Sequence, residues 1–101
     1  MNTIDKVLSF IGLAARARKT ITGEELVVKA IQDQRVHFVL LSTDASENMK
    51  KKITNKCEYY EIPYRILYSR DQLGLAIGKD SRVVIGITDF GFSKRLQELM
   101  E

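Results

Sequence analysis

Apolar residues recur along the chain at intervals of three and four, the spacing that places them on one face of a helix. Near the start this spacing predicts an amphipathic helix whose inner face holds Ile4, Val7, Leu8, Ile11 and Ala14 or Ala15. A second helix is predicted around Val27, Ala30 and Ile31. A third helix, capped by Ser46, is predicted around Met49, Ile53, Cys57 and Tyr60. A final helix, beginning at Asp89 or Ser93, is predicted around Leu96, Leu99 and Met100. Each helix is expected to bury its apolar face.

Short runs of β-favouring residues lie between these helices. Residues 36–41 are apolar at almost every position, which is typical of a central strand covered on both faces. The other predicted strands are residues 19–22, 64–67 and 82–88. Because strands alternate with helices, we expect one α/β domain, residues 1–101, folded as a three-layer α/β/α sandwich whose central sheet is mixed and mainly parallel.

Two tetrapeptides match the capping box, in which a hydroxyl and a Glu or Gln side chain bond the free N–H groups at the start of a helix. They are Thr22-x-x-Glu25, before the second helix, and Ser69-x-x-Gln72. The second box is expected to open a short helix that Gly78 ends.

The charge of the chain is compatible with a nucleic-acid partner. The net charge is +3, but residues 1–70 hold 12 Lys and Arg against 8 Asp and Glu, whereas residues 71–101 hold 4 against 5. No apolar run approaches the roughly 18 residues of a membrane span, and the N-terminus lacks the cationic region of a signal peptide. One cysteine excludes an intramolecular disulfide. We therefore expect a cytoplasmic protein with no membrane partner.

The usual signs of catalysis and cofactor binding are missing from the sequence. His37, the only histidine, falls in a predicted strand and Cys57 on an apolar helix face, so both are interpreted as core or near-core residues. The glycines form neither a GxGxxG motif nor a phosphate loop. Asp44 follows a buried strand, as the phosphorylated aspartate of a receiver domain does, but the acidic pair of such domains is absent. We expect no enzyme activity, cofactor or metal.

The start of the second predicted helix is a candidate binding site. Gly23 lets another backbone come close, the free N–H groups and the helix dipole attract phosphate, and Lys29 lies one to two turns inside. The carboxylates of Glu24 and Glu25 can accept hydrogen bonds from guanine N–H groups. Acidic first turns are also ordinary at helix starts, so the sequence leaves both interpretations open. The basic run of residues 50–52 is interpreted as solvated helix surface, because consecutive helical side chains point about 100° apart.

Five segments of the chain resemble a known family. They are GLAARARK at 12–19, TGEELVVKAI at 22–31, VLLSTDAS at 39–46, IPYRI at 62–66 and LGLAIGK at 73–79. Together they resemble the bacterial YlxQ family, within the superfamily of kink-turn-binding large-subunit ribosomal proteins of the seven-Ae and thirty-e types. The resemblance covers essentially the whole chain. It implies an α/β/α sandwich that binds RNA without catalysis.

The resemblance also implies two RNA contacts. In relatives, a Gly-x-Asn-Glu-x-x-Lys segment meets the sheared G·A pairs of a kink-turn; Gly23 and Lys29 match its ends, whereas Glu25 and Leu26 replace its Asn and Glu. A carboxylate only accepts hydrogen bonds, whereas an asparagine also donates them. The second implied contact is the loop of Ala76, Ile77, Gly78 and Lys79, where Ile77 could cover an extruded nucleotide or be buried instead. The flanking cations Arg16, Arg18 and Lys19 would contact phosphates.

From sequence we therefore expect a monomeric protein that binds a kinked or bulged structured RNA, either ribosomal RNA or another RNA associated with the ribosome. The first alternative is a protein-interaction adaptor that kept the fold and lost RNA affinity, which the altered Gly-Glu-Glu segment favours. A second alternative is a domain for a small ligand, which the missing phosphate loop disfavours.

Overall fold

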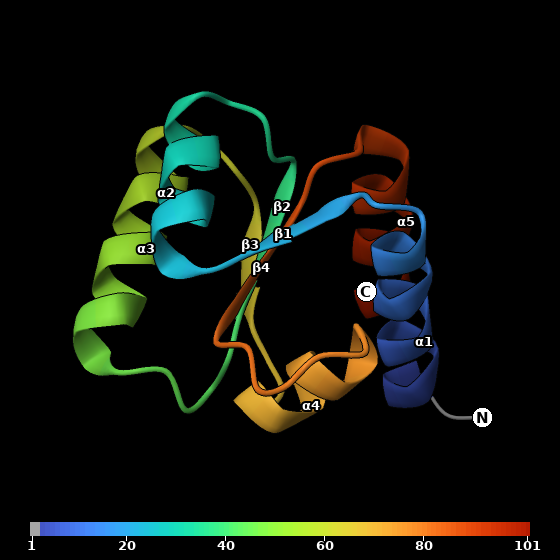
Figure 1. The fold of residues 1–101 in the computed structure, drawn as a ribbon. Coiled ribbons are helices and arrows are strands. Elements are labelled where there is room, and N and C mark those ends of the chain that lie inside the picture. Colours follow the sequence, from blue (N-terminus) through green and yellow to red (C-terminus); the bar gives the residue numbers. More distant parts are fainter. Residues whose placement is uncertain (1–2) are drawn as a thin grey trace.

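The computed structural model describes the backbone of residues 3–101 and the side chains from residue 6 onward, so the predicted inner position of Ile4 lies outside the described side chains. Helices and strands alternate along the chain (Figure 1). In order they are α1 (Thr3–Arg16), β1 (Thr20–Thr22), α2 (Glu24–Gln32), β2 (Phe38–Leu41), α3 (Glu47–Tyr59), β3 (Tyr64–Ile66), α4 (Arg70–Ala76), β4 (Val84–Ile87) and α5 (Phe90–Met100).

The predicted three-layer architecture is confirmed. Figure 1 shows α2 and α3 on one face of the sheet and α1 and α5 on the other, with α4 near one end of the strands. Alternate residues of β2 serve the two layers, because successive side chains of a strand point to opposite faces. Val39 and Leu41 belong to the core under α2 and α3, and Phe38 and Leu40 to the core under α1 and α5.

The sheet is mixed, as expected, but the prediction that it is mainly parallel is wrong. Its strand order is β1-β4-β2-β3, and β4 runs antiparallel to both of its neighbours, so only β2 and β3 pair in parallel. The length of the crossover helix explains the difference. Helix α3, with 13 residues, returns the chain along the sheet between two parallel strands, whereas α4 has only 7 residues and stays near one end. Strand β4 therefore starts near the end where β3 stops and runs back.

The predicted helix starts are confirmed with one exception. The Ser46 hydroxyl accepts a hydrogen bond from the backbone N–H of Met49 at the start of α3, and the Asp89 carboxylate caps α5. Both hydrogen bonds of the box at Ser69 are present. The box at Thr22 is wrong, because Thr22 pairs with Ile85 in the sheet.

Gly23 is the N-cap of α2, with φ at 96°, a conformation that favours glycine, and no side chain caps this helix. The side-chain cap that the sequence predicts at Thr22 is thus absent, and α2 begins at a backbone turn on Gly23. Within the part of the chain that is described, none of the helices combines the length and apolarity that crossing a membrane requires.

Candidate functional site

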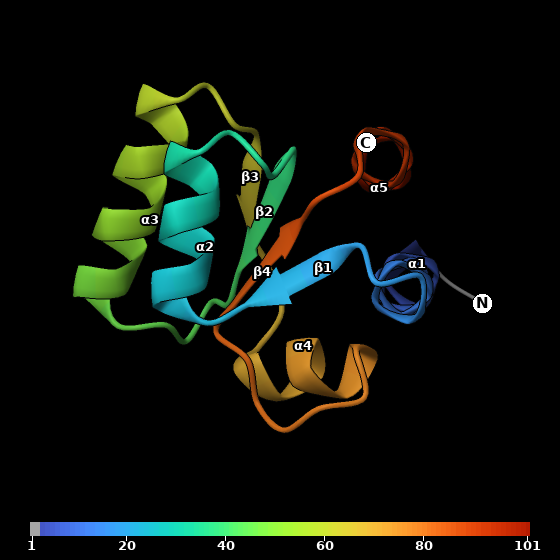
Figure 2. The same cartoon turned by 45° about the horizontal axis from the view of Figure 1, so that its top comes forward.

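A groove of about 580 Å³ lies between the C-terminal end of α1, strand β1 and the end of α4. Figure 2 shows β1 passing from α1 toward α2, with α4 on the neighbouring side. Three segments far apart in the sequence line the groove: Gly12, Ala15 and Arg16; Thr20 and Thr22; and Leu75, Ala76, Ile77, Gly78 and Lys79. Among the described residues, this lining includes two cations and no carboxylate.

Five of the residues selected from sequence meet in this groove. Arg16 comes from the last turn of α1, and the others form the continuous segment 76–79 at the end of α4. The two interpretations of Ile77 turn out to be compatible, because its half-buried side chain packs against the core under α1 and also lines the groove.

The remaining predicted residues of α2 lie beyond the β1 end of the groove. Thr22 lines the groove, and Gly23, Glu24 and Glu25 follow it directly. The first helical hydrogen bond joins the N–H of Val27 to the carbonyl of Gly23, so the N–H groups of residues 24–26 have no partner within the helix. With no side-chain cap, this helix start presents free donors next to the groove.

Two of the charged residues of α2 have partners within the protein. A carboxylate oxygen of Glu24 accepts a hydrogen bond from the Lys52 ammonium of α3 at 2.9 Å. The Lys29 ammonium lies 3.2 Å from Asp33, and its side chain is 70% exposed. An exposed pair of this kind contributes little to stability and leaves the ammonium available to a ligand. Lys29 does not line the groove.

Arg18 and Lys19 form the turn between α1 and β1 and do not line the groove. The N–H of Arg18 bonds the carbonyl of Ala15 at 3.0 Å, and the N–H of Lys19 bonds that of Ala14 at 2.9 Å, which is a Schellman motif. Arg18 takes the left-handed position of this motif, with φ at 62°. Both side chains are exposed, so these cations border the site without forming its wall.

Leu75 is a groove residue that the sequence reasoning missed. Its side chain is 80% exposed, although leucine is normally buried, whereas Leu73 two positions earlier is fully buried. The capping box at Ser69 fixes where α4 begins, and a helix that buries Leu73 must turn Leu75 outward. That signal was present in the sequence. Gly12, Ala15, Thr20 and Thr22 carried no comparable signal.

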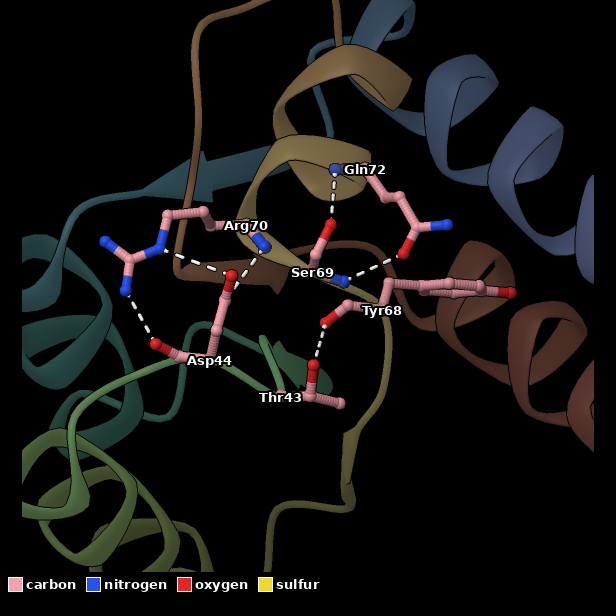
Figure 3. A network of polar contacts seen from close by, with 6 residues as sticks. All are labelled: Thr43, Asp44, Tyr68, Ser69, Arg70 and Gln72. Carbon is pink, nitrogen blue, oxygen red and sulfur yellow. Dashed lines mark hydrogen bonds and ion pairs between the residues drawn. The ribbon is translucent and has the colours of Figure 1, made fainter.

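A polar network attaches the start of α4 to the end of β2 (Figure 3). One carboxylate oxygen of Asp44 accepts a hydrogen bond from the backbone N–H of Arg70 at 3.0 Å, and the other lies 3.5 Å from the Arg70 side chain. The Arg70 guanidinium also donates to the backbone carbonyl of Asp44 at 2.6 Å. Beside it, the N–H and hydroxyl of Thr43 both donate to the carbonyl of Tyr68.

This network gives Asp44 a positioning role in place of the phosphorylation considered from sequence. Desolvation acts to raise the pKa of Asp44, but the neighbouring Ser42 hydroxyl, the backbone N–H of Arg70 and the positive charge of Arg70 together outweigh it, and the pKa lies below its usual value. Asp44 is therefore ionised at neutral pH and holds the first residue of α4. Because α4 is a short rigid helix, fixing its start also places the segment 75–79 at its other end.

The far end of α4 is held by close packing at Gly74. A Cβ added to this residue would lie 2.0 Å from the carbonyl oxygen of Asp80, closer than any side chain could approach. The loop that carries Lys79 thus folds back directly over the backbone of α4. Glycine is required here for space.

The histidine and the cysteine that the sequence offered for catalysis do not line the groove. Cys57 is fully buried, and burial raises the pKa of its thiol to about 12, so it stays protonated and unreactive. His37 precedes β2 instead of lying within a strand, and its half-buried ring packs edge-on against Phe90. Among the residues that the structure describes, no cluster of His, Cys, Asp or Glu could hold a metal ion.

Known proteins resemble this chain over almost its whole length. It is 50% identical to the RNA-binding protein YlxQ of Bacillus subtilis (strain 168) over 91 residues, which cover 90% of this chain and 91% of that protein. It is 47% identical to the RNA-binding protein YlxQ of Enterococcus faecium, with 95% and 92% covered.

Solved structures agree with this match. A protein with unknown function from Bacillus halodurans superimposes with a TM-score of 0.92 at 54% identity, covering 94% of this chain and 96% of that one. The Giardia lamblia 15.5kD RNA binding protein superimposes with a TM-score of 0.81 at 18% identity, covering 96% and 83%, and therefore shows the shared fold alone. The model of the ribosomal protein L7Ae/L30e/S12e/Gadd45 family matches residues 5–97, and the chain belongs to this family.

Proposed function

We propose that this protein binds a kinked or bulged structured RNA, of the kink-turn kind, without catalysing a reaction. The observation that carries the proposal is the groove lined by Arg16, by β1 and by the segment 75–79, because it brings the loop 76–79 together with Arg16 and extends as far as Thr22, which precedes Gly23 at the start of α2. An RNA bulge offers both a phosphate backbone and unstacked bases. The groove offers cations for the first and apolar surface for the second.

Each part of the site has a proposed task. Arg16 and Lys79, on the wall of the groove, contact phosphates and thereby position the RNA. Leu75 and Ile77 supply apolar surface against an extruded base. The Glu25 carboxylate accepts hydrogen bonds from guanine N–H groups, and the free N–H groups at the start of α2 donate to acceptor atoms of the neighbouring bases.

The pairing of Glu24 with Lys52 supports this assignment of tasks. A carboxylate at a helix start would repel an incoming phosphate, and an ammonium 2.9 Å away offsets that charge. The names of the relatives agree, since two of them are called RNA-binding proteins and the family is named after ribosomal proteins. We accordingly propose a monomeric cytoplasmic protein whose RNA is ribosomal or associated with the ribosome.

A gel-shift titration tests the proposal with a kink-turn RNA and with the same RNA after its G·A pairs are disrupted. We expect tighter binding to the intact kink-turn, and weaker binding to both RNAs when Arg16 or Lys79 is changed to alanine. Lys94→Ala is the matched control, because Lys94 is an exposed lysine of α5 that lies outside the groove. Equal affinity for the two RNAs would contradict kink-turn recognition.

An adaptor function is the second candidate, and Leu26 is the observation that favours it. This leucine stands where relatives of the superfamily carry a glutamate, and its side chain is 65% exposed in the first turn of α2. A leucine at this position cannot form the hydrogen bonds with base edges that a glutamate accepts, whereas it can add apolar contact area to a protein partner. If no structured RNA shifts at low salt, and Leu26→Asn abolishes capture of a protein partner, the adaptor is the better account.

A further inference from the structure

A hollow of about 490 Å³ lies on α3, outside the groove described above. Five residues line it: Lys52, Asn55, Lys56, Tyr59 and Tyr60. The first four follow one another at steps of three, one and three, so they lie along one side of the helix. We call this row of four residues the α3 face. The basic run 50–52 drew attention in the sequence, but only Lys52 of that run belongs to the face.

Tyr59 presents an aromatic ring to solvent on this face. Its side chain is 73% exposed, and its ring centroid lies 4.8 Å from that of Tyr60. Tyr60 is half-buried and packs against the core under α2 and α3. The half-buried Tyr60 ring therefore contacts the Tyr59 ring on one side, while most of the Tyr59 side chain stays open to solvent.

The polar residues of the α3 face suit a polyanion that carries bases. Lys52 and Lys56 are cationic, Asn55 can both donate and accept hydrogen bonds, and no residue lining the hollow is acidic within the described part of the chain. Cations beside an exposed aromatic ring are the combination with which proteins bind single-stranded nucleic acid, the ring stacking on a base and the cations following the backbone. An acidic peptide would use the lysines but leave the exposed ring and the amide without a task.

The α3 face also begins beside the proposed RNA site. Lys52 at one end of the face holds Glu24 in the first turn of α2, and Figure 1 shows α2 and α3 side by side. From Lys52 to Tyr59 the helix advances roughly 10 Å.

We propose that the α3 face is a second RNA-binding surface, which takes an unpaired segment flanking the structured RNA. The inference rests on the proposed function, because one RNA molecule is taken to occupy both the groove and the α3 face. It adds a requirement that kink-turn recognition does not have, namely a single-stranded extension.

Fluorescence anisotropy with three kinds of probe separates this inference from the proposed function. The probes are a blunt-ended kink-turn RNA, the same RNA with about eight unpaired nucleotides added at either end in turn, and the unpaired segment alone. The native protein should bind one of the extended RNAs more tightly than the blunt one. Tyr59→Ala should weaken binding of that RNA by roughly fivefold to a hundredfold, the range for loss of a base stack, and leave the blunt RNA unaffected.

Matched variants keep the test specific. Tyr59→Phe keeps the ring and should bind like the native protein, Lys56→Ala should weaken only the extended RNA, and Lys94→Ala in the opposite layer should change neither. Equal affinity of the native protein for blunt and extended RNAs would overturn the inference while leaving the proposed function intact. Failure to bind the blunt RNA, with Tyr59-dependent binding of the unpaired segment, would overturn the proposed function and support the α3 face. The inference would also be overturned if an acidic peptide bound the native protein but not the Tyr59→Ala variant, and the unpaired segment bound neither.

Discussion

Replacing Gly74 by alanine should move the loop at the end of α4 and so test the groove directly. The added Cβ would lie 2.0 Å from the Asp80 carbonyl oxygen, 2.6 Å from its carbonyl carbon and 2.9 Å from the Cα of Ser81. All three atoms belong to the backbone, so no rotation of a side chain relieves the contact. To restore an ordinary separation of 3.4 Å, the loop must move by roughly 1.4 Å.

Two opposing effects set the size of the stability change. Overpacking of this kind costs about 1 to 3 kcal/mol, and a contact with rigid backbone belongs near the upper end. Alanine is preferred to glycine within a helix by about 1 kcal/mol, which offsets part of that cost. We expect a net loss of about 2 kcal/mol, or roughly 8 to 16 °C in Tm for a domain of this size.

The RNA measurement separates displacement of the loop from simple destabilisation. At a temperature where the variant is fully folded by circular dichroism, we expect affinity for a kink-turn RNA to fall about tenfold, which equals roughly 1.4 kcal/mol. Gly91→Ala is the control, because its Cβ would approach only the Asp89 carboxylate, at 3.2 Å. An unchanged Tm for Gly74→Ala would refute the packing argument. A lowered Tm with normal affinity would remove the loop from the binding site.

Three further results are expected. Lys29→Ala should cost on the order of 1 to 3 kcal/mol of binding to a kink-turn RNA and much less to a plain duplex, measured by titration of both; equal losses would make Lys29 a phosphate contact. Asp44→Asn should lower stability in urea at neutral pH, and because the pKa of Asp44 is depressed, its difference from the native protein should shrink as pH falls below 3.8 and Asp44 becomes protonated. Because the pKa of Cys57 is raised to about 12, the protonated thiol contributes stability below pH 9.0, and this contribution, on the order of 4 kcal/mol, should be lost as pH rises toward about 12. Alkaline denaturation of the native protein and of Cys57→Ala measures this, because the free energy of unfolding of the native protein should fall relative to that of the variant over this pH range.

The sequence predicted the elements well because their signals are local. Apolar spacing identified the buried faces of α2 and α3, and the hydroxyls of Ser46 and Ser69 marked the helix starts that the structure shows. Thr22 misled the prediction because the same residue type also favours strands, and pairing with Ile85 decides between the two roles. The direction of β4 depends on where α4 packs, which no local pattern contains.

The candidate site was predictable only in part for the same reason. A resemblance and a short motif selected the segment 76–79 from the sequence. The structure places this segment beside Arg16, about 60 positions earlier in the chain. Capping signals and helix phase are local and could not predict that contact. The ion pair of Glu24 with Lys52 joins α2 to α3, and the spacing of residues along either helix does not predict it. The exposure of Leu75 was the one feature that closer attention to helix phase would have found.

The central position of β4 has a consequence for how the chain folds. Thr20 pairs with Ile87, so β1 pairs with β4, which is the only strand beside it among the described residues, and β2 also pairs with β4 on one side. Bringing these ends together closes a loop of nearly 70 residues, at an entropic cost of about 4 kcal/mol before the sheet compensates it. A nascent chain that stops before residue 84 can form helices and the β2–β3 pair, but β1 has no partner. Folding of the sheet, and with it the wall of the groove that β1 provides, should therefore wait until almost the whole chain has been synthesised.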